Sequence, residues 1–138
     1  MFNTVVDKKL AVFGFSFKPN TGDIRESPAI DIARQLLEEK AKLAITDPEA
    51  LENAEAVLGN QDAAVDFESD PYAAAEGADA LLLLTAWEEF RDLDYTHIFE
   101  RMRKPAFIFD GRNLLDHEKL YDIGFNVFPV GKPSLTHL

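Results

Sequence analysis

The chain has 138 residues, 46% of them apolar, which is enough for one domain with a single core. Its 14 Lys and Arg residues against 25 Asp and Glu give a net charge of −11, which excludes a general nucleic-acid or anionic-membrane binder. Cysteine is absent, so these residues hold no disulfide, thiolate metal site or thiol nucleophile. With only three scattered histidines, we predict no metal site and no catalytic residue. No run of about 18 apolar residues and no secretion signal is present, which predicts a cytoplasmic chain without a membrane span.

Apolar runs of strand length alternate with helical stretches along the sequence. The first predicted strand, 9–15, leads into a loop, 16–26, and Ser27 followed by Pro28 predicts a capped helix that runs to about Glu39. In chain order the remaining predicted elements are strand 41–46, helix 49–58, strand 63–67, helix 70–77, strand 80–85, helical turn 87–91, helix 95–102, strand 106–109, helix 116–123 and strand 125–130. This alternation indicates an α/β fold, a three-layer, Rossmann-like, mostly parallel sheet with helices on both faces.

Two parts of this pattern carry further expectations. The run 80–85 is continuously apolar, so we expect it to be buried on both faces at the centre of the sheet. The last residues, 131–138, are expected to be frayed.

Ligands of open α/β sheets bind at the carboxyl ends of the strands, and three polar clusters follow predicted strands there. The first is the loop 16–26, in which Lys18, Arg25 and the helix start at Ser27 favour an anion such as phosphate. The structural alternative is that both cations are solvated or paired with neighbouring carboxylates. The loop has neither the P-loop nor the dinucleotide glycine pattern, which argues against an ordinary cofactor half-site.

The cluster 110–113 places Arg112 directly after a glycine at a strand end. Arg112 can fork onto a diphosphate while Asp110 orients it. The structural alternative is a turn with Gly111 in the left-handed conformation, Asp110 capping that turn and Arg112 in solvent.

Three further residues have a functional and a structural interpretation. Asp47 ends the second strand, where a doubly wound nucleotide-binding fold often keeps a ribose acceptor, but an Asp before Pro is also a common turn former. The third cluster is Thr85-Ala86-Trp87. Trp87 and Phe90, three residues further on, can stack on a base, whereas an aromatic pair beside a core strand more often serves packing.

Together these motifs resemble the C-terminal UDP-binding domain of the UDP-glucose/GDP-mannose dehydrogenase family. The resemblance rests on four blocks in the family's order: GFSFKPNTGDIRESPA at 14–29, Asp47-Pro48, TAWEEF at 85–90 and FDGRN at 109–113. It covers roughly residues 7–132, and it is strongest to the members that oxidise UDP-glucose.

The resemblance implies a reaction and a set of site residues. Such enzymes oxidise the C6 alcohol of UDP-glucose to the carboxylate of UDP-glucuronate with two NAD, through intermediates bound to a cysteine. They combine an N-terminal NAD-binding domain, a long central helix and the UDP-binding domain. Carried onto this sequence, the resemblance implies that Phe17, Lys18 and Arg112 contact the UDP-sugar and that Arg25 reaches across the interdomain cleft to NAD.

The chain lacks both the dinucleotide fingerprint and the cysteine of such an enzyme. We therefore expect a fragment that binds UDP or UDP-glucose without oxidising it, NAD being held mainly by the missing N-terminal domain. Residues 1–7 would be the stump of the preceding segment, 8–132 the UDP-sugar-binding domain and 133–138 a tail. The expected protein partner is the rest of the parent enzyme, in a homo-oligomer.

Two alternatives stay open. The same domain could belong to a GDP-mannose or UDP-N-acetylmannosamine dehydrogenase, which competition between UDP and GDP would distinguish. The chain could also be a non-catalytic module that mediates assembly.

Overall fold

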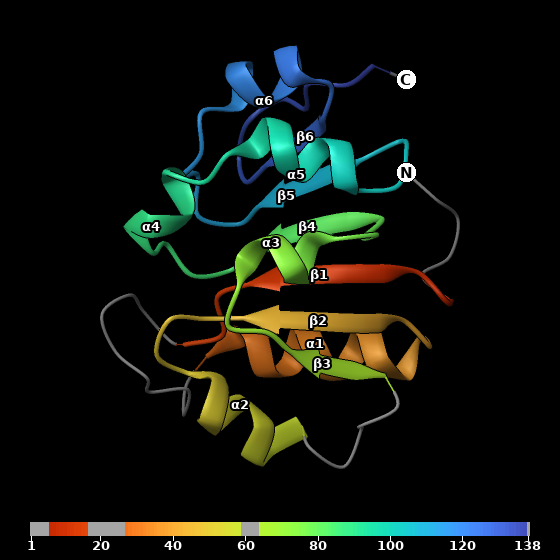
Figure 1. Cartoon of the computed structure of the whole chain (residues 1–138), viewed down its shortest axis with the longest axis vertical. Coiled ribbons are helices and arrows are strands. Elements are labelled where there is room, and N and C mark those ends of the chain that lie inside the picture. Colours follow the sequence, from red (N-terminus) through yellow and green to blue (C-terminus); the bar gives the residue numbers. More distant parts are fainter. Residues whose placement is uncertain (1–5, 17–26, 59–63, 138) are drawn as a thin grey trace.

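The computed structural model describes residues 6–16, 27–58 and 64–137. Six strands form one sheet in the order β3-β2-β1-β4-β5-β6, and each neighbouring pair of strands is parallel. The strands are β1 (Lys9–Phe13), β2 (Lys42–Thr46), β3 (Val65–Phe67), β4 (Ala80–Leu83), β5 (Phe107–Asp110) and β6 (Asn126–Pro129). This topology confirms the predicted Rossmann-like α/β fold, and β4 lies beside β1 at the centre, as its continuous apolar run predicted (Figure 1).

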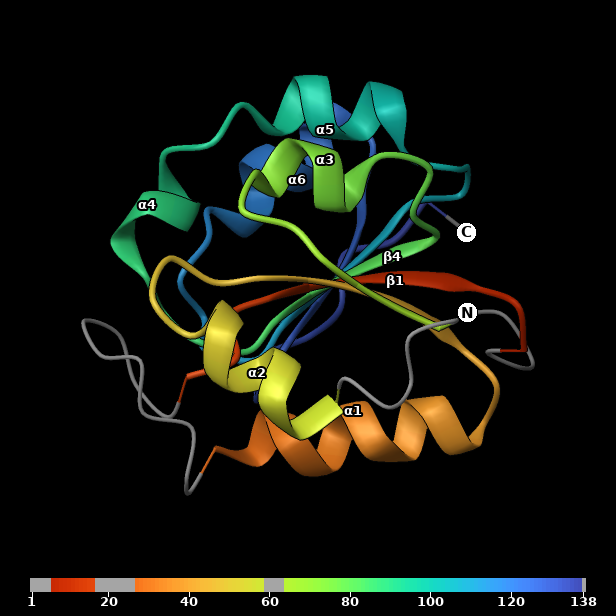
Figure 2. The same ribbon diagram turned by 60° about the horizontal axis from the view of Figure 1, so that its bottom comes forward.

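Helices cover both faces of the sheet, which makes the fold three-layered (Figure 2). One face carries α1 (Pro28–Glu38) and α2 (Leu51–Leu58), and the other carries α3 (Pro71–Ala75), α5 (Tyr95–Arg101) and α6 (His117–Ile123). The short α4 (Glu88–Arg91) lies instead beyond the carboxyl ends of the strands (Figure 1). Because strand residues alternate between faces, the core divides into two clusters. Val12 and Ile45 pack on the α1 side, and Leu81 and Ile108 pack on the other.

Local sequence signals start the helices as predicted. The hydroxyl of Ser27 accepts a hydrogen bond from the Ala29 N–H at 3.2 Å, and Pro28 occupies the first helical position, where no donor is needed. Asp70 caps α3 in the same way through the N–H of Tyr72. At the other end of α3, Gly77 takes up a left-handed conformation with φ of 73°, as its position after the helix predicted.

The first strand is shorter than predicted. It ends at Phe13 because Gly14, with φ of 96°, turns the backbone away from the extended conformation. Phe15 and Ser16 nevertheless remain buried, and Phe15 packs in the core cluster on the α1 side. The loop therefore starts from a buried position.

The prediction of a frayed tail is wrong for the described residues up to 137. Leu135 forms an antiparallel bridge with Val127, through backbone hydrogen bonds of 2.7 and 2.9 Å. The His137 N–H donates to Asn126 Oδ1 at 2.7 Å, and its ring stacks on Tyr121 with the centroids 4.1 Å apart. The tail orders because β6 is an edge strand whose backbone groups it pairs.

Within the described ranges, the structure contains no helix with the length and apolarity that a bilayer crossing requires.

Candidate functional site

Residues 14–16, which follow β1, and the segments that follow β2, β4 and β5 lie at the carboxyl edge of the parallel sheet (Figure 1). Of the residues predicted to bind the ligand, Arg112 lies in the described part, in the turn after β5. Phe17, Lys18 and Arg25 lie outside the described residues, between Ser16 and Ser27. The structure therefore describes the two residues that flank that loop, Ser16 and Ser27, together with the Arg112 turn.

The carboxylate of Asp47 accepts hydrogen bonds from several segments at this edge, and we call it the hub. Its carboxylate is buried, and Oδ2 accepts hydrogen bonds from the N–H of Phe15 at 2.8 Å and from the N–H and hydroxyl of Ser16, both at 3.1 Å. Oδ1 accepts from the N–H groups of Glu49 and Ala50, each at 2.9 Å. Asp47 thus holds the end of β1 against its own turn, which confirms the turn-forming interpretation over the ribose acceptor.

The aromatic pair serves packing, as the structural interpretation predicted. Trp87 is 6% exposed and Phe90 is 1% exposed, so neither ring offers a face to a ligand. Phe90 packs against Phe13 with ring centroids 5.2 Å apart. The indole N–H of Trp87 donates to Asp47 Oδ2 at 3.2 Å, which adds a third segment to the hub.

The end of β1 is also tied to the end of β4. The hydroxyl of Thr85, a fully buried residue, donates to the Ser16 carbonyl at 2.8 Å. Gly14 permits this approach, because a Cβ atom there would lie 2.5 Å from Thr85 Cβ. Side chains at position 14 are therefore excluded by packing as well as by the backbone conformation.

Arg112 is held at this edge by its neighbours. Its Nε donates to the carbonyl of Leu84 at 2.9 Å, and its backbone N–H donates to Asp110 Oδ1 at 3.0 Å. The residue as a whole is exposed. The side chain is thus anchored at Nε, and its two terminal nitrogens make no hydrogen bond to another described residue. This geometry lies between the two interpretations, a ligand-binding fork and a freely solvated side chain.

The turn conformation differs from the structural alternative in one respect. Asn113, with φ of 53°, is left-handed, whereas Gly111 is not. At Gly111 space is tight instead, because a Cβ there would lie 3.0 Å from the Leu83 carbonyl oxygen. The Asn113 side chain donates to the Val130 carbonyl at 2.9 Å, which stabilises the left-handed residue.

Asp110 anchors the Arg112 turn from below. It is fully buried, and its Oδ2 accepts from the Leu115 N–H at 2.9 Å and lies 2.8 Å from His117 Nε2. Burial acts to raise the pKa of this carboxyl group, but the hydrogen bonds from Leu115, His117 and Arg112 outweigh burial and hold the pKa below its ordinary value. The carboxylate is therefore ionised at neutral pH and caps the turn as predicted.

We expect Asp110→Asn to lower the free energy of unfolding at neutral pH by about 2 kcal/mol. Because the folded pKa of Asp110 lies below the ordinary value of 3.8, its stabilisation is complete above that value and disappears as the pH falls through the folded pKa. The difference between wild type and variant should therefore shrink under acid conditions. Urea unfolding between about pH 7 and pH 2 measures it, with Asp122→Asn, an exposed carboxylate in α6, as control. A difference that does not change with pH would contradict the prediction.

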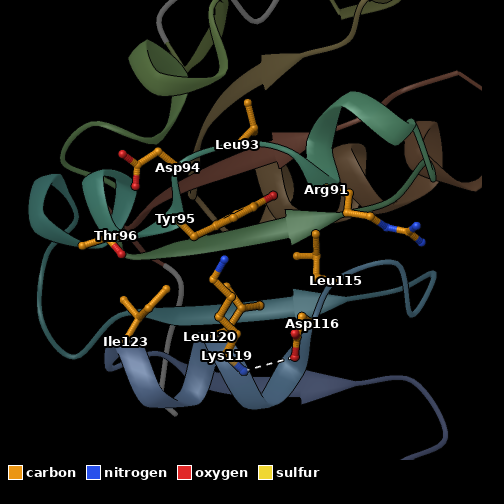
Figure 3. Close-up of a pocket in the computed structure, with 10 residues that line it drawn as sticks. All are labelled: Arg91, Leu93, Asp94, Tyr95, Thr96, Leu115, Asp116, Lys119, Leu120 and Ile123. Atoms are coloured by element: carbon orange, nitrogen blue, oxygen red, sulfur yellow. Dashed lines mark hydrogen bonds between the residues drawn. The ribbon is translucent and has the colours of Figure 1, made fainter.

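A cavity of about 330 Å³ lies between α5 and α6, on the face of the sheet that these helices cover (Figure 3). Asp94 and Asp116 stand on its rim, but each caps a helix, through the N–H groups of His97 and Lys119 respectively. Burial raises the pKa of Tyr95, whose hydroxyl donates to the Phe90 carbonyl and is thus not an acid or base at neutral pH. Asp94, Asp116 and Tyr95 thus serve the fold.

A comparison with protein families identifies the family of the chain. The model of the UDP-glucose/GDP-mannose dehydrogenase family, UDP binding domain, matches residues 11–117. The chain belongs to this family. The matched residues include both the hub at Asp47 and the Arg112 turn, so this edge of the sheet belongs to the UDP binding domain.

Individual relatives agree with the family match. The UDP-glucose 6-dehydrogenase of Caenorhabditis elegans is 50% identical over 138 residues, covering 95% of this chain and 29% of that protein. The enzyme of the same name from Drosophila melanogaster is 47% identical over 146 residues, covering 96% and 30%. This chain thus spans about three-tenths of the length of these relatives.

Solved structures show the same architecture. A UDP-glucose dehydrogenase from Pyrobaculum islandicum superposes with a TM-score of 0.70 at 31% identity, over 88% of this chain and 26% of that one. A UDP-D-ManNAc dehydrogenase from Pyrococcus horikoshii gives 0.73 at 25% identity, over 93% and 26%.

The described part of the UDP binding domain does not fit the adenosine half of NAD. Dinucleotide-binding domains of this topology keep a carboxylate for the ribose and an open glycine turn for the pyrophosphate. Here both oxygens of Asp47 already accept hydrogen bonds within the protein, and Thr85 packs over Gly14. Among the described residues there is also no group of three or more side chains suited to holding a metal ion.

The roles of two residues at this edge could not be predicted from the sequence. Ser16 stands directly before the predicted ligand residues, but a serine in a loop gives no sign of how its polar groups pair. His117 was counted as one of three scattered histidines, although it lies against Asp110, seven residues earlier. The Asp-x6-His spacing could have drawn attention only once the turn between them was known.

Proposed function

We propose that this chain is the C-terminal, UDP-sugar-binding part of a UDP-glucose 6-dehydrogenase, an enzyme that oxidises UDP-glucose to UDP-glucuronate with two NAD. The chain alone binds UDP or UDP-glucose and does not oxidise it, since the 138 residues contain no cysteine to serve as nucleophile. NAD is bound mainly by the rest of the parent enzyme, and Arg25 reaches across the interdomain cleft to the NAD. That the parent is a cytoplasmic homo-oligomer stays a prediction.

The Arg112 guanidinium carries this proposal. It is anchored through Nε to the Leu84 carbonyl, at the strand ends where open α/β sheets bind their ligands. Its terminal nitrogens have a geometry that suits two phosphate oxygens at once. An anchored arginine also loses less side-chain entropy on binding than one that is free in solution. In a chain with a net charge of −11, a cation fixed at this edge supports a local anion site.

We expect UDP to bind the chain and Arg112→Ala to weaken that binding by about 30-fold to 100-fold, because a charge-assisted contact to the diphosphate is lost. Isothermal titration calorimetry with UDP, UDP-glucose and uridine measures the affinities. Uridine lacks the diphosphate, so it should bind more weakly than UDP and be insensitive to Arg112→Ala. Arg103→Ala is the matched control, since Arg103 is also exposed but lies before β5, at the opposite end of the strands.

The outcomes separate the candidate functions. No heat with UDP at millimolar concentration, or equal affinity in wild type and Arg112→Ala, would refute a UDP site at this edge. Tighter binding of GDP than of UDP would assign the chain to a GDP-mannose dehydrogenase. The UDP-D-ManNAc dehydrogenase among the similar structures makes UDP-N-acetylmannosamine a further ligand for the same titration.

A further inference from the structure

Ser16 has every one of its polar groups tied to a neighbouring strand end. Its N–H and hydroxyl both donate to Asp47 Oδ2, at 3.1 Å, after β2. Its carbonyl accepts from Thr85 Oγ1, at 2.8 Å, after β4. Because β2 and β4 flank β1 on its two sides, Ser16 is clamped from both directions, and the residue is only 1% exposed.

This clamp adjoins the anchor of Arg112, and Ser16 directly precedes the predicted contacts Phe17 and Lys18 in the sequence. On the other side, Leu84, the residue before Thr85, supplies the carbonyl that anchors Arg112. The end of β4 therefore contacts Ser16 through Thr85 and holds Arg112 through Leu84. Its position sets the spacing between Ser16 and Arg112.

We propose that Thr85 is a positioning residue for UDP binding, which fixes Ser16 against the strand end that also anchors Arg112. Thr85 does not touch the ligand, because it is fully buried. It acts by restricting where the chain leaves Ser16, so that less conformational entropy is lost when the ligand binds. The inference rests on the proposed function and names a residue that the family resemblance did not assign to the site.

Thr85→Val is the decisive variant, because valine keeps the branched shape but cannot donate to the Ser16 carbonyl. We expect the dissociation constant for UDP to rise about tenfold, since one buried hydrogen bond controls the position of Ser16. Thr85→Ser keeps the hydroxyl and should restore the affinity to within about twofold of wild type. Calorimetric titration with UDP measures both, and thermal unfolding of each variant shows that it folds.

A destabilised control separates positioning from a general loss of stability. Asp79 is a buried carboxylate at the opposite end of β4, where it accepts from the Lys9 N–H at 3.0 Å. Asp79→Ala should lower the melting temperature while leaving the dissociation constant for UDP within about twofold of wild type.

The possible results are all informative. Weaker binding in Thr85→Val with recovery in Thr85→Ser supports the proposal. Wild-type affinity in Thr85→Val, or an equal loss of affinity in Asp79→Ala, overturns the positioning role and leaves UDP binding intact. If wild type itself gives no heat with UDP, the proposed function fails and the positioning role fails with it.

Discussion

Asp47→Ala is expected to lower the free energy of unfolding by about 4 kcal/mol, a large share of the stability of an ordinary domain. The substitution leaves the N–H groups of Phe15, Ser16 and Ala50 without their acceptor, together with the indole N–H of Trp87. Buried donors without a partner cost more than the hydrogen bonds contributed, because water does not reach them.

Urea unfolding followed by the fluorescence of Trp87, the only tryptophan in the sequence, measures this loss next to the hub itself. Far-ultraviolet circular dichroism gives an independent probe of the same transition. Asp47→Asn keeps the size of the side chain and one acceptor oxygen, so it should cost about half as much and stay folded. Asp79→Ala is the matched control, since one backbone N–H is known to donate to that carboxylate. Equal losses in Asp47→Ala and Asp79→Ala would show that Asp47 is not a hub.

Gly14→Ala is expected to be about as destabilising, by roughly 4 kcal/mol, for two reasons that add. Gly14 has φ of 96°, a conformation that side chains rarely adopt. A Cβ atom would also lie 2.5 Å from Thr85 Cβ and 2.7 Å from the Thr85 backbone nitrogen. The second contact is to backbone, so trimming the side chain at position 85 does not relieve it.

Gly131→Ala isolates the backbone contribution. Gly131 has a similarly positive φ of 71°, but nothing lies within 4 Å of its Cβ position. We therefore expect a loss of about 1 kcal/mol there, against the larger loss at position 14. Thermal and urea unfolding of the two variants give the comparison. A Gly14→Ala protein as stable as Gly131→Ala would mean that β1 and β4 separate at little cost.

Much of the fold could be predicted because its signals are local. The continuous apolar run 80–85 predicted a central buried strand, and β4 lies beside β1 in the middle of the sheet. Ser27 and Pro28 predicted the start of α1, since a cap involves groups only two residues apart. The family blocks are likewise contiguous stretches, so the family could be identified from the sequence and was confirmed by the match over residues 11–117.

The roles of individual polar residues depended on pairs that are remote in the chain. Asp47 reaches Phe15 across 32 positions and Trp87 across 40, and Thr85 reaches Ser16 across 69. No local pattern distinguishes a carboxylate that binds a ribose from one that accepts backbone N–H groups, because both occupy the same place after a strand. Only the packed sheet determines which donors lie within reach.

The same distinction holds for the turn and the tail. Sequence placed Arg112 at a strand end, but the Leu84 carbonyl that anchors it comes from the residue after the neighbouring strand β4. The tail was expected to fray because its residues have no pattern of their own, whereas Leu135 pairs with an exposed edge of β6. The sequence by itself determined the order of the elements, the family and the cations at the strand ends, since these depend on neighbouring residues. Tertiary structure decided which polar groups hold the fold and which remain for a ligand, because buried hydrogen bonds form between whichever donors and acceptors packing brings together.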